Sequence, residues 1–143
     1  MDHAIPSREG NMLPGQGTRL EGLLAKARED PDVLAVFLFG SAARGEEGPR
    51  SDVDVCLVLT DAAADNLAAS RKRLDYMAAS DLDVRVFQRV PLYIRHRILK
   101  EGRLLFSRDE DLVYELAVRT AREFERFKPI YREYLEQVAR AGS

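Results

Sequence analysis

The sequence predicts an α/β (α+β) fold in which a mixed β-sheet of about four strands packs against flanking helices. Two almost wholly apolar runs, residues 33–39 and 53–59, have the length and the β-branched content of buried strands. Segments with apolar residues at helical spacing alternate along the chain with these two runs and with further, shorter strand patterns. Alternating strands and helices bury their apolar faces by packing helices on a sheet.

The first helix is predicted over residues 19–29, where Leu20, Leu23 and Leu24 recur at helical spacing. Pro31 ends it, because a residue before proline is biased away from the helical region. Residues 1–18 contain several glycines and prolines with little apolar pattern, so we expect a flexible leader. Residues 19–143 then form a single domain with helices at its C-terminus.

The second half of the chain continues the alternation. A helix capped by Thr60 or Asp61 is predicted to run to about residue 77, with Leu67, Leu74 and Met77 on its inner side. Residues 82–87 alternate like a third strand, and a helix over 92–100 and a short strand over 104–106 follow. A long helix is predicted over 109–127, with Leu112, Leu116 and Phe124 on one side.

Pro129 is expected to kink or break this last helix before it continues over residues 130–139. Aromatic residues recur in the last helices, and we expect them to lie in the core or against a partner protein. These residues are Tyr114, Phe124, Phe127, Tyr131 and Tyr134.

Composition excludes several classes of function. The net charge of −2 provides no overall basic field, so we expect no direct binding of nucleic acid. The apolar stretches fall short of the roughly 18–20 residues that span a bilayer, so we expect no membrane association. The single cysteine, Cys56, rules out a disulfide within the chain and predicts a reducing, cytoplasmic location.

The most informative pattern is a Gly-Ser turn followed, after ten residues, by an Asp-x-Asp pair. Gly40 directly follows the first strand, where the lack of a Cβ lets a ligand approach the backbone. Ser41 opens a short helix predicted over residues 41–44, and a helix start binds phosphate. Arg44 could reach the same phosphate groups.

Asp52 and Asp54 lie two residues apart on a strand and therefore project from the same face. Paired carboxylates repel each other unless a cation lies between them, and such hard oxygen ligands suit Mg²⁺. Asp81 and Asp83 form a second pair at the third strand, and Asp83, inside the run, is the favoured third carboxylate. The alternative interpretation is that Asp83 forms an ion pair with Arg85 or lies on a surface face.

The Gly-Ser turn, the Asp-x-Asp pair and the later aspartate resemble the polymerase-β-like nucleotidyltransferases, and among these the minimal nucleotidyltransferase (MNT) group. The matching text is Phe-Gly-Ser-Ala-Ala-Arg-Gly over residues 39–45 and Ser-Asp-Val-Asp-Val over residues 51–55. The helix–Gly–strand passage over residues 97–106 is also similar to that group. The resemblance covers residues 20–134 and implies the palm-like fold of polymerase β.

MNT proteins are commonly antitoxins of HEPN ribonuclease toxins, and the family transfers AMP from ATP to a tyrosine of the toxin. The resemblance implies that Gly40 and Ser41 hold the triphosphate and that Arg44 neutralises pyrophosphate. It also implies that Asp52 and Asp54 bind two Mg²⁺ ions, while Asp83 binds the ion nearest the acceptor and helps to orient or deprotonate the attacking hydroxyl.

Two other functions stay open at this point. The chain could neutralise a toxin by forming a complex alone, with an idle nucleotide site. It could also transfer a nucleotide to a small molecule such as an antibiotic, although at 143 residues it has no evident second domain for an acceptor pocket.

Overall fold

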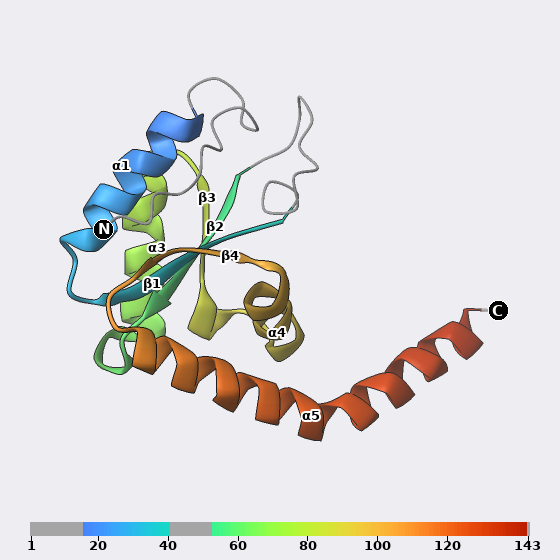
Figure 1. The fold of residues 1–143 in the computed structure, drawn as a ribbon. Helices are drawn as coiled ribbons and strands as arrows, with labels where there is room; N and C mark the ends of the chain where they lie inside the picture. The colour runs from blue at the N-terminus through green and yellow to red at the C-terminus, as the bar shows by residue number, and fades with distance from the viewer. Residues whose placement is uncertain (1–15, 41–52, 143) are drawn as a thin grey trace.

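The computed structural model describes residues 16–40 and 53–142, and its centre is a four-stranded sheet (Figure 1). The strands lie in the order β3-β2-β1-β4. They comprise β1 (Val33–Phe39), β2 (Asp54–Leu59), β3 (Asp83–Val86) and β4 (Arg103–Ser107). β1 is antiparallel to β2 and β4, whereas β2 and β3 are parallel. The predicted mixed sheet of about four strands is therefore confirmed.

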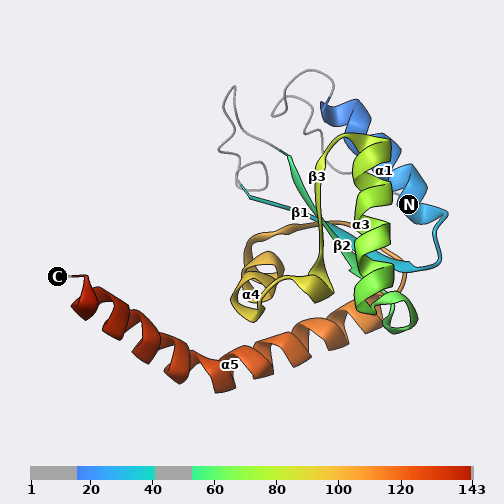
Figure 2. The ribbon, with the colours of Figure 1, turned by 180° about the vertical axis from the view of Figure 1, so that it is seen from behind.

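Helices cover both faces of the sheet (Figures 1 and 2). α1 (Gln16–Arg28) and α3 (Asn66–Ser80) pack on one face, and α4 (Leu92–Glu101) and the start of α5 (Glu110–Ala141) pack on the other. Two short 3₁₀ helices, η2 (Asp61–Ala63) and η3 (Phe87–Arg89), follow β2 and β3. This arrangement matches the predicted fold class of a sheet with flanking helices.

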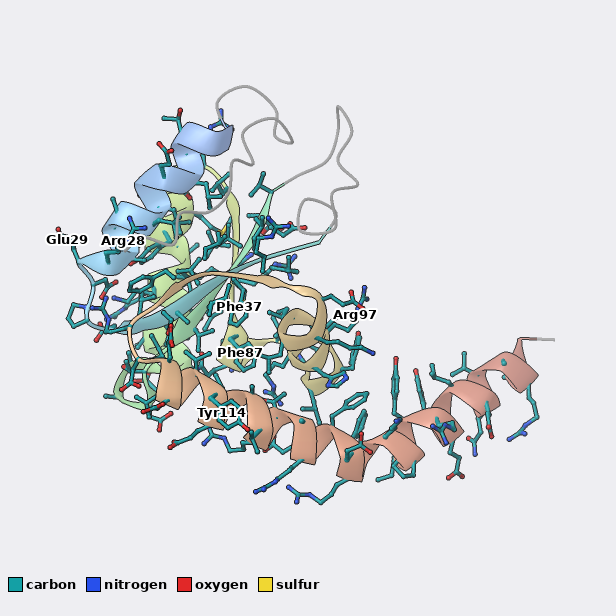
Figure 3. The ribbon with its side chains drawn as sticks, in the orientation of Figure 1. Arg28, Glu29, Phe37, Phe87, Arg97 and Tyr114 are labelled. Carbon is teal, nitrogen blue, oxygen red and sulfur yellow. The ribbon has the colours of Figure 1, made fainter. Side chains whose placement is uncertain are left out.

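Successive side chains of a strand point to opposite faces of the sheet, so the buried residues form two clusters, one on each face. Val55 and Leu57 of β2 face α1 and α3, whereas Cys56 and Val58 face α4 and α5. The second cluster includes Phe37 and Phe87, which are labelled in Figure 3. Side chains at the even-numbered positions of β2 therefore project toward α4, and this determines the face of the candidate site.

Two element boundaries differ from the sequence predictions. α1 begins at Gln16, so the last three residues of the predicted leader are helical, and the rest of that leader lies outside the described residues. The helix expected from Thr60 or Asp61 is divided: a 3₁₀ turn comes first, and α3 begins only after Asp65, whose carboxylate accepts a hydrogen bond from the Ala68 amide. Asp65 is thus the N-cap.

The inward face of α3 was predicted correctly for Met77, which packs against the core, and wrongly for the two leucines. Leu67 and Leu74 are more than half exposed, whereas Ala69 and Tyr76 are completely buried against the sheet. Helical spacing identifies sets of residues that share a face, but tertiary packing decides which set faces inward. The Tyr76 ring can be buried because its hydroxyl group has a hydrogen-bond partner, Asp30.

α5 is continuous through Pro129 and bends near its middle (Figure 1). Leu116 is buried as predicted, but Leu112 is 46% exposed. Three of the aromatic residues form a row against α4: His96 stacks on Phe124 at 3.9 Å between ring centroids, and Tyr93 stacks on Tyr131 at 5.6 Å, with Phe127 between the two stacks. No helix in the described part of the chain is long and apolar enough to cross a membrane.

The distal half of α5 extends away from the rest of the molecule (Figures 1 and 2). It presents exposed apolar side chains, namely Ile130, Tyr134, Leu135 and Val138. Tyr114, nearer the start of α5, is 70% exposed and is labelled in Figure 3. Of the five aromatic residues singled out in the sequence, Tyr114 and Tyr134 are thus outside the core.

Arg108, just after β4, joins the C-terminus of α1 to the sheet. Its guanidinium group donates hydrogen bonds to the carbonyl oxygens of Ala27, Arg28, Asp30 and Val33 at 2.8–3.0 Å. The last carbonyl groups of a helix have no partner within the helix, and this side chain provides one. α1 therefore reaches β1 through a turn whose carbonyl groups are held in place.

Asp30 connects the same turn to α3. Its carboxylate accepts hydrogen bonds from Lys72 Nζ at 3.0 Å and from the Tyr76 hydroxyl at 2.8 Å. Burial alone would raise the pKa of Asp30, but the hydrogen bonds from Lys72, Tyr76 and the Asp32 amide outweigh it and lower the pKa below its ordinary value of 3.8. The folded chain therefore favours the ionised form of Asp30.

We predict that Asp30→Asn destabilises the fold by about 2 kcal/mol at neutral pH, because it weakens hydrogen bonds to a charged acceptor. A lowered pKa contributes stability that is complete above about pH 5 and is lost as the pH falls through the folded-state value. Urea unfolding of both proteins between pH 7 and pH 2.5 should show the difference shrinking at acid pH. A difference that stays constant over that range would contradict the prediction.

Candidate active site

Gly40 ends β1 in a backbone conformation that requires glycine. Its φ angle is +83°, in the left-handed region that residues with a Cβ rarely adopt. A Cβ built at this position would collide with Oδ2 of Asp54. Gly40 therefore leaves room for the Asp54 carboxylate, and the glycine of the predicted turn lies against the second aspartate of the predicted acid pair.

Asp54 and Asp83 are direct neighbours in the sheet. They open β2 and β3, and the parallel register pairs Asp54 with Asp83 and Val55 with Val84. Val55 and Val84 belong to the core cluster on the α1 and α3 side, so the two aspartates project from the opposite face, toward α4. The predicted proximity of Asp83 to the Asp-x-Asp strand is therefore present in the fold.

Asp83 is partly exposed and forms an ion pair with Arg85, with Oδ1 and Nε 3.5 Å apart. The ion pair with Arg85, which was one alternative interpretation of Asp83, is thus present in the structure. The side chains are 36% and 51% exposed, so this pair is of the solvent-screened kind that contributes little to stability. The carboxylate remains accessible to solvent and to a ligand.

Asp81 does not share the face of Asp83. It is the C-cap of α3, with a φ angle of 59°, and its amide donates to the Met77 carbonyl. Its side chain is 86% exposed and lies 3.8 Å from Arg19 of α1. Of the two acids near the third strand, only Asp83 therefore lies beside Asp54.

Three predicted site residues, Ser41, Arg44 and Asp52, and the short helix expected over residues 41–44 lie outside the described residues. Within residues 16–40 and 53–142, the acidic, histidine and cysteine side chains form no group of three that could hold a metal ion. The described part of the site consists of Gly40, Asp54 and Asp83, with Arg85 beside them.

These residues fit a divalent cation. Carboxylate oxygens are the ligands that Mg²⁺ prefers, and one or two carboxylates are its usual complement beside substrate phosphates and water. Asp54 and Asp83 provide two carboxylates at adjacent register positions on one face. The missing Cβ of Gly40 lets the Asp54 carboxylate lie against the end of β1. The two carboxylates therefore suit a magnesium ion that also binds a substrate phosphate group.

Sequence reasoning missed the contribution of α4 to this region. The side chains of Ile94, Arg97 and Glu101 lie next to Phe39 and Gly40 around a hollow at the end of β1. The helix–Gly–strand passage over residues 97–106 stood out in the sequence, but no function was assigned to its side chains. The approach of α4 to β1 is a tertiary contact that helical periodicity does not encode.

Comparison with known proteins places these features in a family. The model of the family described as polymerase beta, nucleotidyltransferase matches residues 21–111. A relative from Methanocaldococcus jannaschii, named "Putative protein adenylyltransferase MJ1547", is 27% identical over 108 residues, which are 74% of this chain and 75% of the relative.

Solved structures have the same fold. A toxin–antitoxin crystal structure with AMP-PNP superposes with a TM-score of 0.66 at 21% identity, over 89% of this chain and 99% of the other. A tri-AMPylated HEPN toxin in complex with MNT antitoxin, from Shewanella oneidensis, gives a TM-score of 0.61 at 18% identity, over 93% and 99% of the two chains. A crystal structure of the toxin–antitoxin MntA-HepT gives 0.60 at 18% identity, over 87% and 97%.

We predict that Gly40→Ala destabilises the fold by about 1–3 kcal/mol, because the new Cβ is strained at positive φ and collides with Asp54. Gly22→Ala is the matched control. Gly22 lies in α1 with open space around it, so alanine there should stabilise by about 0.5–1 kcal/mol. Thermal and urea unfolding measure both changes, and equal effects at the two positions would contradict the prediction.

Proposed function

Because this chain belongs to the polymerase beta nucleotidyltransferase family, we propose that it transfers AMP from ATP to a tyrosine hydroxyl of a partner HEPN toxin and so acts as its antitoxin. The observation that carries the proposal is the pairing of Asp54 with Asp83 beside Gly40. The names of similar proteins support the donor and the acceptor: one is an adenylyltransferase, one complex holds AMP-PNP, and another holds an AMPylated HEPN toxin.

In this proposal Asp52 and Asp54 hold two Mg²⁺ ions, and Asp83 joins them at the ion nearest the acceptor. Bound ions of this kind offset the negative charge of a triphosphate. Gly40 and Ser41 hold the triphosphate, and Arg44 neutralises the charge of the pyrophosphate.

Asp83 has a second task in the proposed reaction. The tyrosine oxygen forms a bond to the α-phosphorus, and the bond from that phosphorus to pyrophosphate breaks. Asp83 orients the hydroxyl group and accepts its proton, which is then released to water. Its partly exposed position is consistent with this task, because the acceptor belongs to another protein and has to approach from solvent.

We expect a cytoplasmic location and a hetero-oligomer with the toxin. The single cysteine, Cys56, is buried as a free thiol, and burial raises its pKa far above the usual range, so it is not a reactive nucleophile. A chain with one such thiol needs no oxidising compartment to fold.

One observation favours a second candidate function, in which the chain neutralises a toxin by binding alone. The distal half of α5 extends from the body with exposed apolar side chains, and such a surface suits a protein partner. Loss of the carboxylate site would leave neutralisation intact under this candidate and would abolish it under the first.

We predict that Asp54→Asn and Asp83→Asn each lower AMP transfer to the toxin by roughly 10²–10³-fold, because each removes a charge that is aimed at the reacting groups. Asp81→Asn is the matched control, since this exposed acid lies outside the site. Transfer is measured with labelled ATP, Mg²⁺ and the purified toxin. Full transfer by either site variant would refute the proposed mechanism.

We also predict that chelation of Mg²⁺ with EDTA abolishes labelling and that added Mg²⁺ restores it. Toxin neutralisation should be measured beside labelling in the Asp52→Asn/Asp54→Asn double variant. Neutralisation without labelling in that variant would support the binding-only candidate. Labelling that persists in EDTA would contradict metal dependence.

A further inference from the structure

A cavity of about 270 Å³ lies between the end of β1 and α4. Its lining residues are Phe39, Gly40, Ile94, Arg97, Ile98 and Glu101. Pockets for whole drug-sized ligands measure about 300–1,000 Å³, so this space suits one ring system better than an entire nucleotide. Gly40 belongs both to the cavity and to the contact with Asp54, and the cavity therefore adjoins the candidate active site.

The cavity and Asp83 lie on opposite sides of Asp54. In the sheet order β3-β2-β1-β4, Asp83 belongs to β3, Asp54 to β2 and Gly40 follows β1. The register pairs Asp54 with Asp83 on one side and with Phe39 on the other. If Asp83 faces the acceptor, as proposed above, the cavity beside Phe39 is on the donor side of the site.

The lining favours a flat, uncharged ring over a phosphate group. Phe39, Ile94 and Ile98 contribute apolar surface, and Ile98 is only 1% exposed. Arg97 and Glu101 form an i,i+4 ion pair with Nη2 and Oε1 3.5 Å apart, so their charges offset each other and do not attract an anion. Figure 3 shows Arg97 on α4.

The same ion pair offers a hydrogen-bond donor beside an acceptor. The Arg97 guanidinium donates, and the Glu101 carboxylate accepts. The edge of adenine has the complementary pattern, because its exocyclic amine donates and its ring nitrogen N1 accepts. The ring of Phe39 provides aromatic surface against which a base can pack.

We propose that this cavity binds the purine base of the donor nucleotide, with Arg97 and Glu101 at the edge of the base and Phe39 and Ile94 against its faces. The inference rests on the proposed function, because it treats the Asp54 side of β1 as the donor side. It assigns base binding to α4, an element that contributes none of the carboxylates.

The test compares the binding of ATP with that of ribose 5-triphosphate, which lacks the base, by isothermal titration calorimetry in Mg²⁺. Wild type should bind ATP roughly tenfold more tightly, as expected for one base packed on an aromatic ring. Ile94→Trp fills the cavity, and Glu101→Ala removes the acceptor. Both variants should bring the two affinities close together, and Ile94→Trp, which changes no charge, should leave the affinity for ribose 5-triphosphate unchanged.

Tyr93→Trp is the matched control for the tryptophan substitution, because Tyr93 is the preceding residue of α4 and does not line the cavity. It should keep the tenfold preference for ATP. Glu101 is 43% exposed, so its variant tests the inference even if the Ile94 variant fails to fold.

Equal affinities of wild type for the two ligands, together with AMP transfer that depends on Asp54, would overturn this inference and leave the proposed function intact. A preference for ATP that survives in Ile94→Trp and Glu101→Ala, with a raised KM for the acceptor protein, would overturn it in favour of an acceptor pocket. A wild type that transfers no AMP and binds neither ligand would overturn both proposals.

Discussion

The parallel register between β2 and β3 is the constraint on which the candidate site depends. It places Asp54 opposite Asp83 and sends both side chains to the face covered by α4. A slip of one residue would turn one of the two acids toward the core on the α1 side, where a charge has no partner. The apolar residues that alternate with the acids, Val55 and Val84, fix this register because both are completely buried. The packing that buries Val55 and Val84 therefore also sets the relative positions of Asp54 and Asp83.

The rest of the fold maintains that register from outside the site. α3 connects β2 to β3, and its length and caps set where β3 begins. Asp81 closes the helix in a left-handed conformation, and Asp83 then opens the strand two residues later. Asp30 and Arg108 hold the turn between α1 and β1 from two directions, so β1 is anchored at the end opposite Gly40. Gly40 can adopt its positive φ angle without strain because it has no Cβ.

The strands could be predicted from the sequence because their apolar runs are a strong local signal. Residues 33–39 are apolar throughout since β1 is buried on both faces. Asp52 lies outside the described residues, so its predicted place on the same face as Asp54 stays a prediction. The inward face of α3 could be predicted only in part, because Ala69 and Tyr76 are weaker apolar signals than Leu67 and Leu74. Asp83 lies beside Asp54 because β3 is next to β2 in the sheet, and the hydrophobic periodicity of the sequence does not determine the order of the strands. The cavity beside Gly40 forms only when α4 packs on β1, and no local pattern reports such a contact.

The bend in α5 has a consequence for how the helix is stabilised along its length. Pro129 has no amide hydrogen, so the carbonyl four residues earlier lacks its helical partner at this point. Turns before the proline pack on α4 and the sheet, whereas most residues beyond Tyr131 are exposed. Their opening is governed by local helix propensity and is uncoupled from global unfolding. One continuous helix therefore contains two units of different stability, and amide hydrogen exchange would be fast in the distal unit wherever nothing covers it.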